Sequence, residues 1–410
     1  MSAVESSDLY TRDRSTAALS LILPGLNDDE QDQFILGRSF FTIPWVEAPA
    51  ATTARDGLGP LFNANSCVAC HRNNGGGDAV KSPGPVSRSV VMRLSSDPVY
   101  GNQIAINGIH GVPFEARVEA DIEVFQVDYG DGSSEAMFKP RFELSSLQYG
   151  PVINPGRVNP RRAPSLVGLG LIETLPESEI LKRVDAEDRD NDGISGRDNR
   201  VWSLEHNDWR LGRFGWKAST PSVIEQSAQA LIDDLGLTNR WHPVEPCSDR
   251  QKACQEAYSS SELDVPDARL EAIAFYLTRL KTPAPVAFSA GEKIFERIGC
   301  SACHSKGMET RDGLVINPYS DFLLHDMGED LADFDTVYRA TPREWRTAPL
   351  WGIGLAKKMN PGSGFLHDGR TDTLQGAILW HGGEALPSKM RYIALSAAER
   401  DLIISFLESL

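Results

Sequence analysis

Two pentapeptides of the pattern Cys-x-x-Cys-His constrain this chain more than any other feature of its sequence. They supply Cys67, Cys70 and His71 in the first half, and Cys300, Cys303 and His304 in the second. This spacing is typical of c-type haem attachment, in which two cysteines tether the porphyrin and the adjacent histidine is the proximal iron ligand. A zinc ribbon would pair its cysteine knuckles across a short spacer, which is absent here. The sequence therefore predicts two covalently bound haem c groups.

The composition excludes several classes of protein. With 410 residues, the chain is long enough for two or three domains with buried cores. A formal net charge of −16 argues against a nucleic-acid partner, because phosphate binding needs a basic face. No apolar run approaches the length of a membrane span. Residues 1–14 are polar and lack the apolar stretch of a signal peptide.

Haem c is attached outside the cytoplasm, so we expect a periplasmic protein whose export signal has been removed. The two cysteines outside the haem motifs, Cys247 and Cys254, lie close together in the sequence. In an oxidising compartment such a pair is expected to form a local disulfide. The alternative is a metal site with His242, which we reject because no second histidine lies nearby.

The two halves of the chain repeat several short motifs. Phe62 and Phe295 each stand five residues before the first cysteine of a haem motif. Residues 162–171 resemble residues 346–355, and residues 214–226 resemble residues 365–377. Each half closes on apolar residues at helical spacing, in segments 268–280 and 397–410. Ser396 and Glu399 indicate a capping box at the start of the last helix.

This duplication predicts a mainly α protein of two cytochrome-c-like helical domains. The first comprises residues 1–281 and holds the active-site haem, and the second comprises residues 286–410 and holds the electron-transfer haem. A stiff, proline-rich segment joins them. Residues 117–144 alternate apolar and polar side chains around a Gly-Asp-Gly turn, which predicts a small β-hairpin inserted in the first domain.

The residues opposite the proximal histidines decide what each haem can do. An iron with two protein ligands transfers electrons, whereas an iron with an open face can bind peroxide or oxygen. We predict that His381 is the distal ligand of the second haem, because the following glycine pair would let the backbone approach the porphyrin closely. Met327, Met359 and Met390 are competing ligands, and a surface or core histidine is the alternative role of His381.

The repeat predicts a different distal face for the first haem. Thr373 aligns with Ser222, so His381 aligns with Ala230, which cannot ligate iron. We therefore expect an open or weakly filled distal face there, unless His110, His206 or His242 reaches it from an insertion. A peroxidatic site also needs a group that takes a proton from peroxide and returns it to the leaving oxygen. The candidates near Ala230 are Glu225, Gln226, Asp233 and Asp234, with a solvated helix face as the alternative for each.

These motifs resemble the bacterial dihaem cytochrome c peroxidase superfamily. Within it, the chain is most similar to the di-haem oxidoreductase family, whose members are described as peroxidases and sometimes named thiol oxidoreductases. The resemblance covers most of the chain, with its best segments at residues 58–64, 193–197, 213–218, 324–328 and 365–370. The second family name finds no support here, since the only cysteines outside the haem motifs are expected to form a structural disulfide.

The resemblance implies roles for individual residues. Trp216 matches the tryptophan that relays electrons between the haems, and Gln226 matches a glutamine of the active pocket. Asp234 is the candidate acid and base, although it is one methylene shorter than the glutamate of the peroxidases. His381 stands where the peroxidases carry a methionine, and bis-histidine ligation lacks the upward pull of methionine on the reduction potential. The resemblance further implies peroxide as substrate and a small cytochrome or cupredoxin as electron donor, and it leaves a homodimer open.

An acidic segment predicts a calcium site. Asp188, Asp190 and Asp192 alternate before Gly193, a pattern in which carboxylates converge on one hard cation and the glycine permits a sharp turn. The twelfth position of this pattern is Asn199 rather than the bidentate glutamate of an EF-hand. A solvated acidic turn is the alternative.

Three functions remain compatible with the sequence. The first is reduction of hydrogen peroxide at the first haem, with electrons arriving through the second haem and Trp216. The second is oxidation of a protein or small substrate through high-valent haem. The third is electron transfer by two haems whose irons each have two protein ligands. Ala230 argues against this function, because alanine cannot ligate iron. The sequence does not separate the first from the second, because both need the same open iron.

Overall fold

The computed structural model describes residues 6–154, 156–286 and 288–410. Helix accounts for 30% of the chain and strand for 21%. The prediction of a mainly α fold of two cytochrome-c-like domains is therefore wrong. In the described part, the strands form seven sheets of two or three strands each. Many are pairs of two to four residues, too short to leave a periodic pattern in the sequence. The boundaries at 281 and 286 stay a prediction.

The helices are α1 (Asp28–Thr42), α2 (Leu169–Thr174), α3 (Glu177–Leu181), α4 (Val223–Leu235), α5 (Lys252–Gln255), α6 (Asp267–Thr278), α7 (Ser289–Arg297), α8 (Ala356–Met359), α9 (Leu374–Trp380), α10 (Leu386–Ile393) and α11 (Ala397–Ser409). The strands of the first half are β1 (Tyr10–Thr11), β2 (Leu61–Phe62), β3 (Gly84–Pro85), β4 (Val90–Asp97), β5 (Gly101–Gln103), β6 (Asn107–Gly108), β7 (Arg117–Asp128), β8 (Ser134–Ser145), β9 (Asn159–Arg162), β10 (Arg200–Ser203) and β11 (Asp208–Leu211). The remaining strands are β12 (Thr282–Pro283), β13 (Met308–Glu309), β14 (Val315–Ile316), β15 (Leu324–Asp326) and β16 (Glu344–Arg346). Every described helix is too short or too polar to span a bilayer.

Each half contains a pair of helices that meet at a glycine. A methyl group added to Gly37 of α1 would lie 1.8 Å from the carbonyl oxygen of Ala272 on α6. A methyl group added to Gly291 of α7 would lie 2.1 Å from the carbonyl oxygen of Leu402 on α11. Only glycine allows the two backbones of each pair to approach so closely. The pairs α1–α6 and α7–α11 are therefore the repeated helical unit.

The glycines also fix which aromatic residues correspond between the halves. Phe41 lies four residues after Gly37, and its ring centroid is 6.4 Å from that of His71. Phe295 lies four residues after Gly291, and its ring centroid is 6.2 Å from that of His304. The structural partner of Phe295 is thus Phe41, and the pairing with Phe62 expected from equal spacing is wrong. Phe62 lies on strand β2, within the long connection that the first half inserts between α1 and its haem motif.

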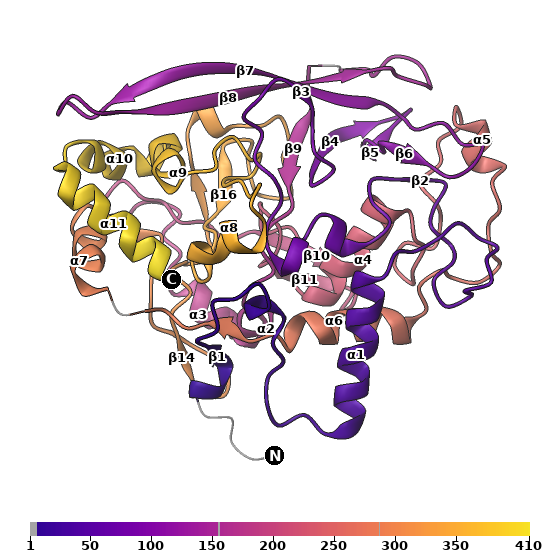
Figure 1. Cartoon of the computed structure of the whole chain (residues 1–410), viewed down its shortest axis with the longest axis horizontal. Helices are drawn as coiled ribbons and strands as arrows, with labels where there is room; N and C mark the ends of the chain where they lie inside the picture. Colours follow the sequence, from indigo (N-terminus) through magenta and orange to yellow (C-terminus); the bar gives the residue numbers. More distant parts are fainter. Residues whose placement is uncertain (1–5, 155, 287) are drawn as a thin grey trace.

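The predicted β-hairpin is confirmed as the long antiparallel pair β7–β8, which runs in register from Arg117 opposite Ser145 to Asp128 opposite Ser134. Figure 1 shows it across the top of the molecule, reaching from the sheets of the first half over α9 and α10. At its tip, Tyr129 packs edge-on against Tyr392 of α10, and Asp131 pairs with Arg400 of α11. An insertion of the first half thereby becomes part of the packing of the second.

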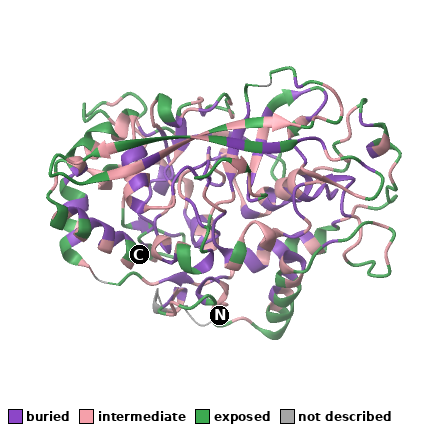
Figure 2. Cartoon of the chain, turned by 45° about the horizontal axis from the view of Figure 1, so that its top comes forward, coloured by how far each residue is buried: buried purple, intermediate pink, exposed green. Residues whose placement is uncertain are grey.

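Buried residues are concentrated around the helix pairs and beneath the hairpin (Figure 2). The largest apolar core joins α1, α4 and α6 to residues of the second half such as Met308 and Phe322. Two local predictions are confirmed. The Ser396–Glu399 capping box begins α11, and the disulfide joins Cys247 to Cys254.

Candidate functional site

Both Cys-x-x-Cys-His motifs line one cavity of about 670 Å³ with predominantly apolar walls. Each motif begins with a single turn of 3₁₀-helix, at Cys67–Ala69 and at Cys300–Ala302. The four motif cysteines form no disulfide, so their sulfur atoms are free to form thioethers. The sequence predicted two haem groups, and the structure brings their attachment motifs together around a common interior.

The two proximal histidines have their ring orientation fixed by backbone carbonyl groups. Nδ1 of His71 lies 2.9 Å from the carbonyl oxygen of Pro164, and Nδ1 of His304 lies 2.8 Å from that of Tyr319. A carbonyl oxygen only accepts, so Nδ1 donates its proton and Nε2 is left as the ligating nitrogen. Burial lowers the pKa of both histidines to about 4. Both are therefore neutral, as iron ligation requires.

The structure places His381 opposite His304. Their ring centroids are 6.5 Å apart, and Nδ1 of His381 is held 2.8 Å from the carbonyl oxygen of Ala377. Two metal–imidazole bonds of about 2 Å each, plus half a ring on either side, add up to a similar span. One iron between these two imidazoles therefore fits the spacing. Of the competing methionines, Met390 is largely exposed, whereas Met327 and Met359 line the cavity.

Helix α4 occupies in the first half the place that α9 occupies in the second. Ser222 caps α4 as Thr373 caps α9, each accepting a backbone N–H three residues on. An isolated antiparallel β-bridge pairs Phe214 with Thr220, and a second one pairs Phe365 with Thr371 in the other half. Both repeats have the offset used to align the sequences, so Ala230 is the position of the first half that corresponds to His381. Ala230 lies within α4, whereas His381 directly follows the last residue of α9. His110, His206 and His242 are not among the described residues that line the cavity.

One face of α4 presents polar groups to this cavity. Gln226, Ala230 and Asp234 recur every four residues, so they share a helix face, and all three line the cavity. The amide of Gln226 accepts a hydrogen bond of 2.9 Å from the Thr220 hydroxyl through Oε1, so its NH₂ group remains available as a donor. Glu225 faces away from it, because its carboxylate accepts hydrogen bonds from Ser203 and Leu204.

Asp234 combines an unusual protonation equilibrium with a position in the cavity wall. Burial raises its pKa to about 6, and a hydrogen bond of 2.8 Å from Nε2 of Gln103 to its Oδ1 opposes that rise. Asp233 pairs with Arg93 at 3.4 Å beside it. Gln103 and Arg93 come from strands β5 and β4. Sequence reasoning missed them because these strands lie in an insertion without a recognisable motif.

Aromatic rings contribute to the cavity wall, among them one stacked pair. Trp216 lines the cavity, and its indole N–H donates to the carbonyl oxygen of Arg162 at 2.7 Å. Trp345 stacks on His367 with ring centroids 3.7 Å apart and an interplanar angle of 13°. The ammonium group of Lys217 lies 4.2 Å from the Trp345 ring centroid. The sequence singled out Trp216 but gave no role to the Trp345–His367 pair.

Two arginines that correspond in the repeat cross between the halves. Nε of Arg162 donates to the carbonyl oxygen of Leu366 at 3.0 Å, and Nε of Arg346 donates to that of Gly215 at 2.9 Å. Both line the cavity, and burial lowers the pKa of each guanidinium to about 10. Within the described residues, no carboxylate lies at salt-bridge distance from either.

Buried charges are normally paired, so we expect anionic groups to lie near these two guanidinium groups inside the cavity. The propionate groups of a bound haem are carboxylates of the right charge. The free motif cysteines, the neutral histidines and the two unpaired cations all fit a pair of haem groups held between the halves.

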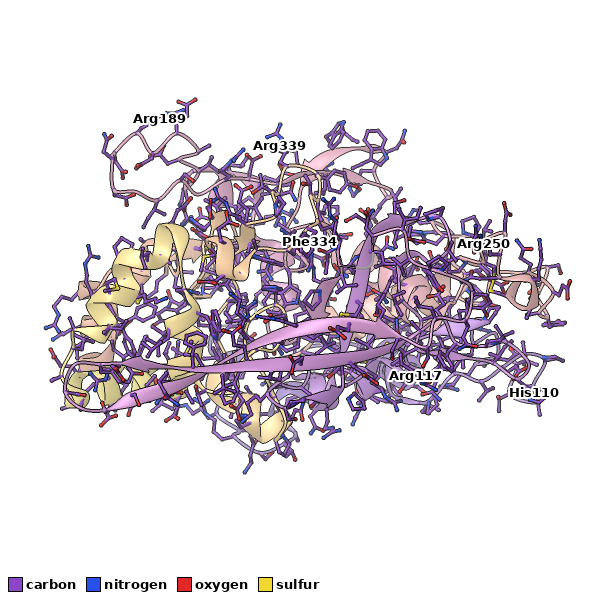
Figure 3. All side chains as sticks on the ribbon, turned by 90° about the horizontal axis from the view of Figure 1, so that it is seen from above. His110, Arg117, Arg189, Arg250, Phe334 and Arg339 are labelled. Atoms are coloured by element: carbon purple, nitrogen blue, oxygen red, sulfur yellow. A yellow bond between two sulfur atoms is a disulfide. The ribbon has the colours of Figure 1, made fainter. Side chains whose placement is uncertain are left out.

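The predicted calcium ligands lie together on an exposed loop. One carboxylate oxygen each of Asp188, Asp190 and Asp192 lies within 4.8 Å of the others. Arg189 marks this loop where it projects from the molecule in Figure 3. Asn199, the twelfth position of the pattern, is instead buried, and its amide donates to the carbonyl oxygen of Lys217. Calcium binding stays a prediction.

Comparison with known proteins gives one extensive match. A family model described as “Di-haem oxidoreductase, putative peroxidase” matches residues 3–99 and 115–410. No curated protein matches the chain significantly. Among solved structures, the chain is similar to a hydrazine synthase from Kuenenia stuttgartiensis with 19% identity and a TM-score of 0.24. That match covers 41% of this chain and 63% of the other, and it is too remote to support any argument.

Proposed function

This chain belongs to the di-haem oxidoreductase family, and from that premise we propose that it reduces hydrogen peroxide. Cys67, Cys70 and His71 would hold the haem at which peroxide is reduced, and Cys300, Cys303 and His304 would hold the haem through which electrons arrive. The reaction consumes one peroxide molecule, two electrons and two protons and releases two water molecules. When bound, each haem supplies an iron that gains or loses one electron at a time.

The observation that carries this proposal is the difference between α4 and α9. His381 faces His304 across 6.5 Å, whereas the corresponding position on α4 is Ala230. A side chain without a donor atom leaves the space opposite His71 open to a small substrate. Two irons with these surroundings suit two different tasks, substrate reduction in the first half and electron transfer in the second.

The polar groups on α4 supply what peroxide cleavage requires of the protein. Asp234, as a carboxylate, would take a proton from one peroxide oxygen and deliver it to the oxygen that leaves as water. A pKa of about 6 suits this role, because a group that accepts and then donates a proton works best when its pKa is near the ambient pH. The NH₂ group of Gln226 orients the peroxide.

We further propose the route by which electrons arrive. Trp216 lies in the cavity wall and is our candidate relay between the haems. A small cytochrome or cupredoxin in the periplasm is the proposed donor, since a net charge of −16 can steer a basic partner toward the protein.

An electron paramagnetic resonance spectrum of the oxidised dihaem protein tests the proposal. We expect one low-spin signal from a bis-histidine haem and one high-spin signal from a haem with an open face. Two low-spin signals would instead indicate an electron carrier. Turnover with peroxide and a reduced donor cytochrome then separates peroxide reduction from oxidation of another substrate. In the latter case peroxide reacts with the protein, but the donor cytochrome is not oxidised catalytically.

A further inference from the structure

The loop that carries His381 packs against residues 324–328, which comprise strand β15 and the two residues after it. A methyl group added to Gly383 would lie 2.2 Å from the carbonyl oxygen of Asp326, and one added to Gly382 would lie 2.8 Å from that of Met327. Gly328 makes the reciprocal contact, since its methyl group would lie 2.8 Å from the backbone nitrogen of Gly383. The glycine pair was expected to approach the porphyrin, and the structure shows it pressed against the end of β15.

His325 lies on β15 of the same segment. It is 3% exposed, and each ring nitrogen faces a carboxylate. Nδ1 lies 2.8 Å from Oε2 of Glu384, and Nε2 lies 2.8 Å from Oδ2 of Asp321. A neutral imidazole has only one N–H, whereas the protonated ring donates from both nitrogens, so the geometry is that of an imidazolium between two carboxylates.

The two carboxylates belong to opposite sides of the second haem site. Glu384 follows His381 by three residues, on the loop that bears the distal ligand, and it also accepts from the hydroxyl group of Ser195. The backbone N–H of Asp321 donates to the carbonyl oxygen of Cys303 at 2.9 Å, directly before the proximal His304. The ring of His325 therefore connects the distal loop to the proximal motif by two charge-assisted hydrogen bonds.

We propose that His325 is a positioning residue that keeps His381 bound to the second iron. The rigid ring of His325 fixes the separation between the loop that bears His381 and the segment that bears His304. Gly328, Gly382 and Gly383 allow that loop to pack directly against the end of β15. Loss of either hydrogen bond allows the loop to move away, and His381 is then displaced more readily by an external ligand. The inference rests on the proposed role of His381.

The test uses the purified dihaem protein and cyanide, which binds an iron only after the distal protein ligand has left. Wild type is compared with His325→Leu, which removes both hydrogen bonds, and with His325→Gln, which can retain one. Glu384→Ala removes the distal connection, together with the hydrogen bonds that this carboxylate accepts from Ser195 and from the backbone N–H of Asp326. His110→Leu is the matched control, because His110 is exposed and lies at the far end of the molecule from α10 and α11 (Figure 3).

We expect His325→Leu and Glu384→Ala to raise the rate of cyanide binding at the second haem by roughly tenfold, equivalent to about 1.4 kcal/mol in the barrier. His325→Gln should fall between them and wild type, and the high-spin signal of the first haem should not change. If His325→Leu does not yield dihaem protein, the other two variants decide.

Wild-type rates at the second haem in every dihaem variant would overturn the positioning role and leave the proposed function intact. A rate that rises equally at both haems would also overturn it, because general loosening of the fold would explain that result. A wild-type protein without a low-spin second haem would refute the ligand assignment itself, and the positioning role with it.

Discussion

Replacement of Asp234 by asparagine tests the proposed proton transfer directly. The amide has nearly the same shape but cannot accept the proton of peroxide. We expect the second-order rate constant for the reaction with peroxide to fall by about 10²- to 10⁴-fold, the range typical of general acid–base catalysis. The measurement is stopped-flow absorbance of the oxidised protein after mixing with peroxide. The resting spectrum should not change, because Asp234 is not an iron ligand.

The pH dependence follows from the raised pKa of Asp234. Only the carboxylate form accepts a proton, so the wild-type rate should increase as the pH rises through about 6 and level off above it. Gln103→Leu removes a hydrogen bond to the carboxylate worth about 1.5 kcal/mol, so it should move this inflection upward by about one unit. Asp233→Asn removes a neighbouring negative charge and should move the inflection downward.

Stability distinguishes lost chemistry from a damaged fold. The folded protein holds the Asp234 proton up to a pH of about 6, whereas the unfolded chain releases it near 3.8. The folded state therefore binds more protons between these values, and stability declines as the pH rises through that window. The penalty at neutral pH is about 3 kcal/mol at most, and Asp234→Asn removes it. We expect its urea midpoint at pH 7 to equal or exceed that of wild type. Wild-type rates with peroxide in Asp234→Asn, or an inflection that survives in it, would refute the assignment.

Three further predictions concern other parts of the molecule. His381→Ala should convert the second haem to high spin in the oxidised spectrum, and an unchanged spectrum would reject that ligand. Gly37→Ala and Gly291→Ala should each lower the free energy of unfolding by about 1–3 kcal/mol through overpacking, whereas Gly156→Ala, which meets open space, should cost far less in the same urea titration. If calcium binds the acidic loop, a concentration of about 100 times its dissociation constant should stabilise the protein by about 2.7 kcal/mol, and Asp190→Asn should reduce the shift in calorimetry.

Local features of the fold could be predicted where the sequence carries a short-range signal. The hairpin alternates with period two around glycines, the last helix begins with Ser396 and Glu399, and the two cysteines of the disulfide lie close together in the chain. The correspondence of Ser222 with Thr373 was also available, since both are helix caps before similar residues. These signals act over a few residues, so the insertions do not obscure them.

The fold class and several site residues depend on contacts between distant segments. Short strand pairs such as β2–β6 form because the surrounding chain positions them. Strands of two residues are too short to show a period-two pattern of apolar residues in the sequence. Equal spacing to the haem motif suggested Phe62 as the counterpart of Phe295, but helix packing at Gly37 selects Phe41 instead. Arg93 and Gln103 reach Asp234 from a sheet of the inserted region. The crossing of Arg162 and Arg346 requires both halves to be folded together.

The contact between the β7–β8 hairpin and the C-terminal helices has a consequence for the order of assembly. Tyr129 and Met137 are synthesised long before Tyr392 and Arg400, the residues that complete their surroundings. During synthesis from the N-terminus, the outer part of the hairpin has no apolar surface to cover it. Docking of this ribbon must therefore wait until α10 and α11 have been synthesised, so this part of the native topology forms late.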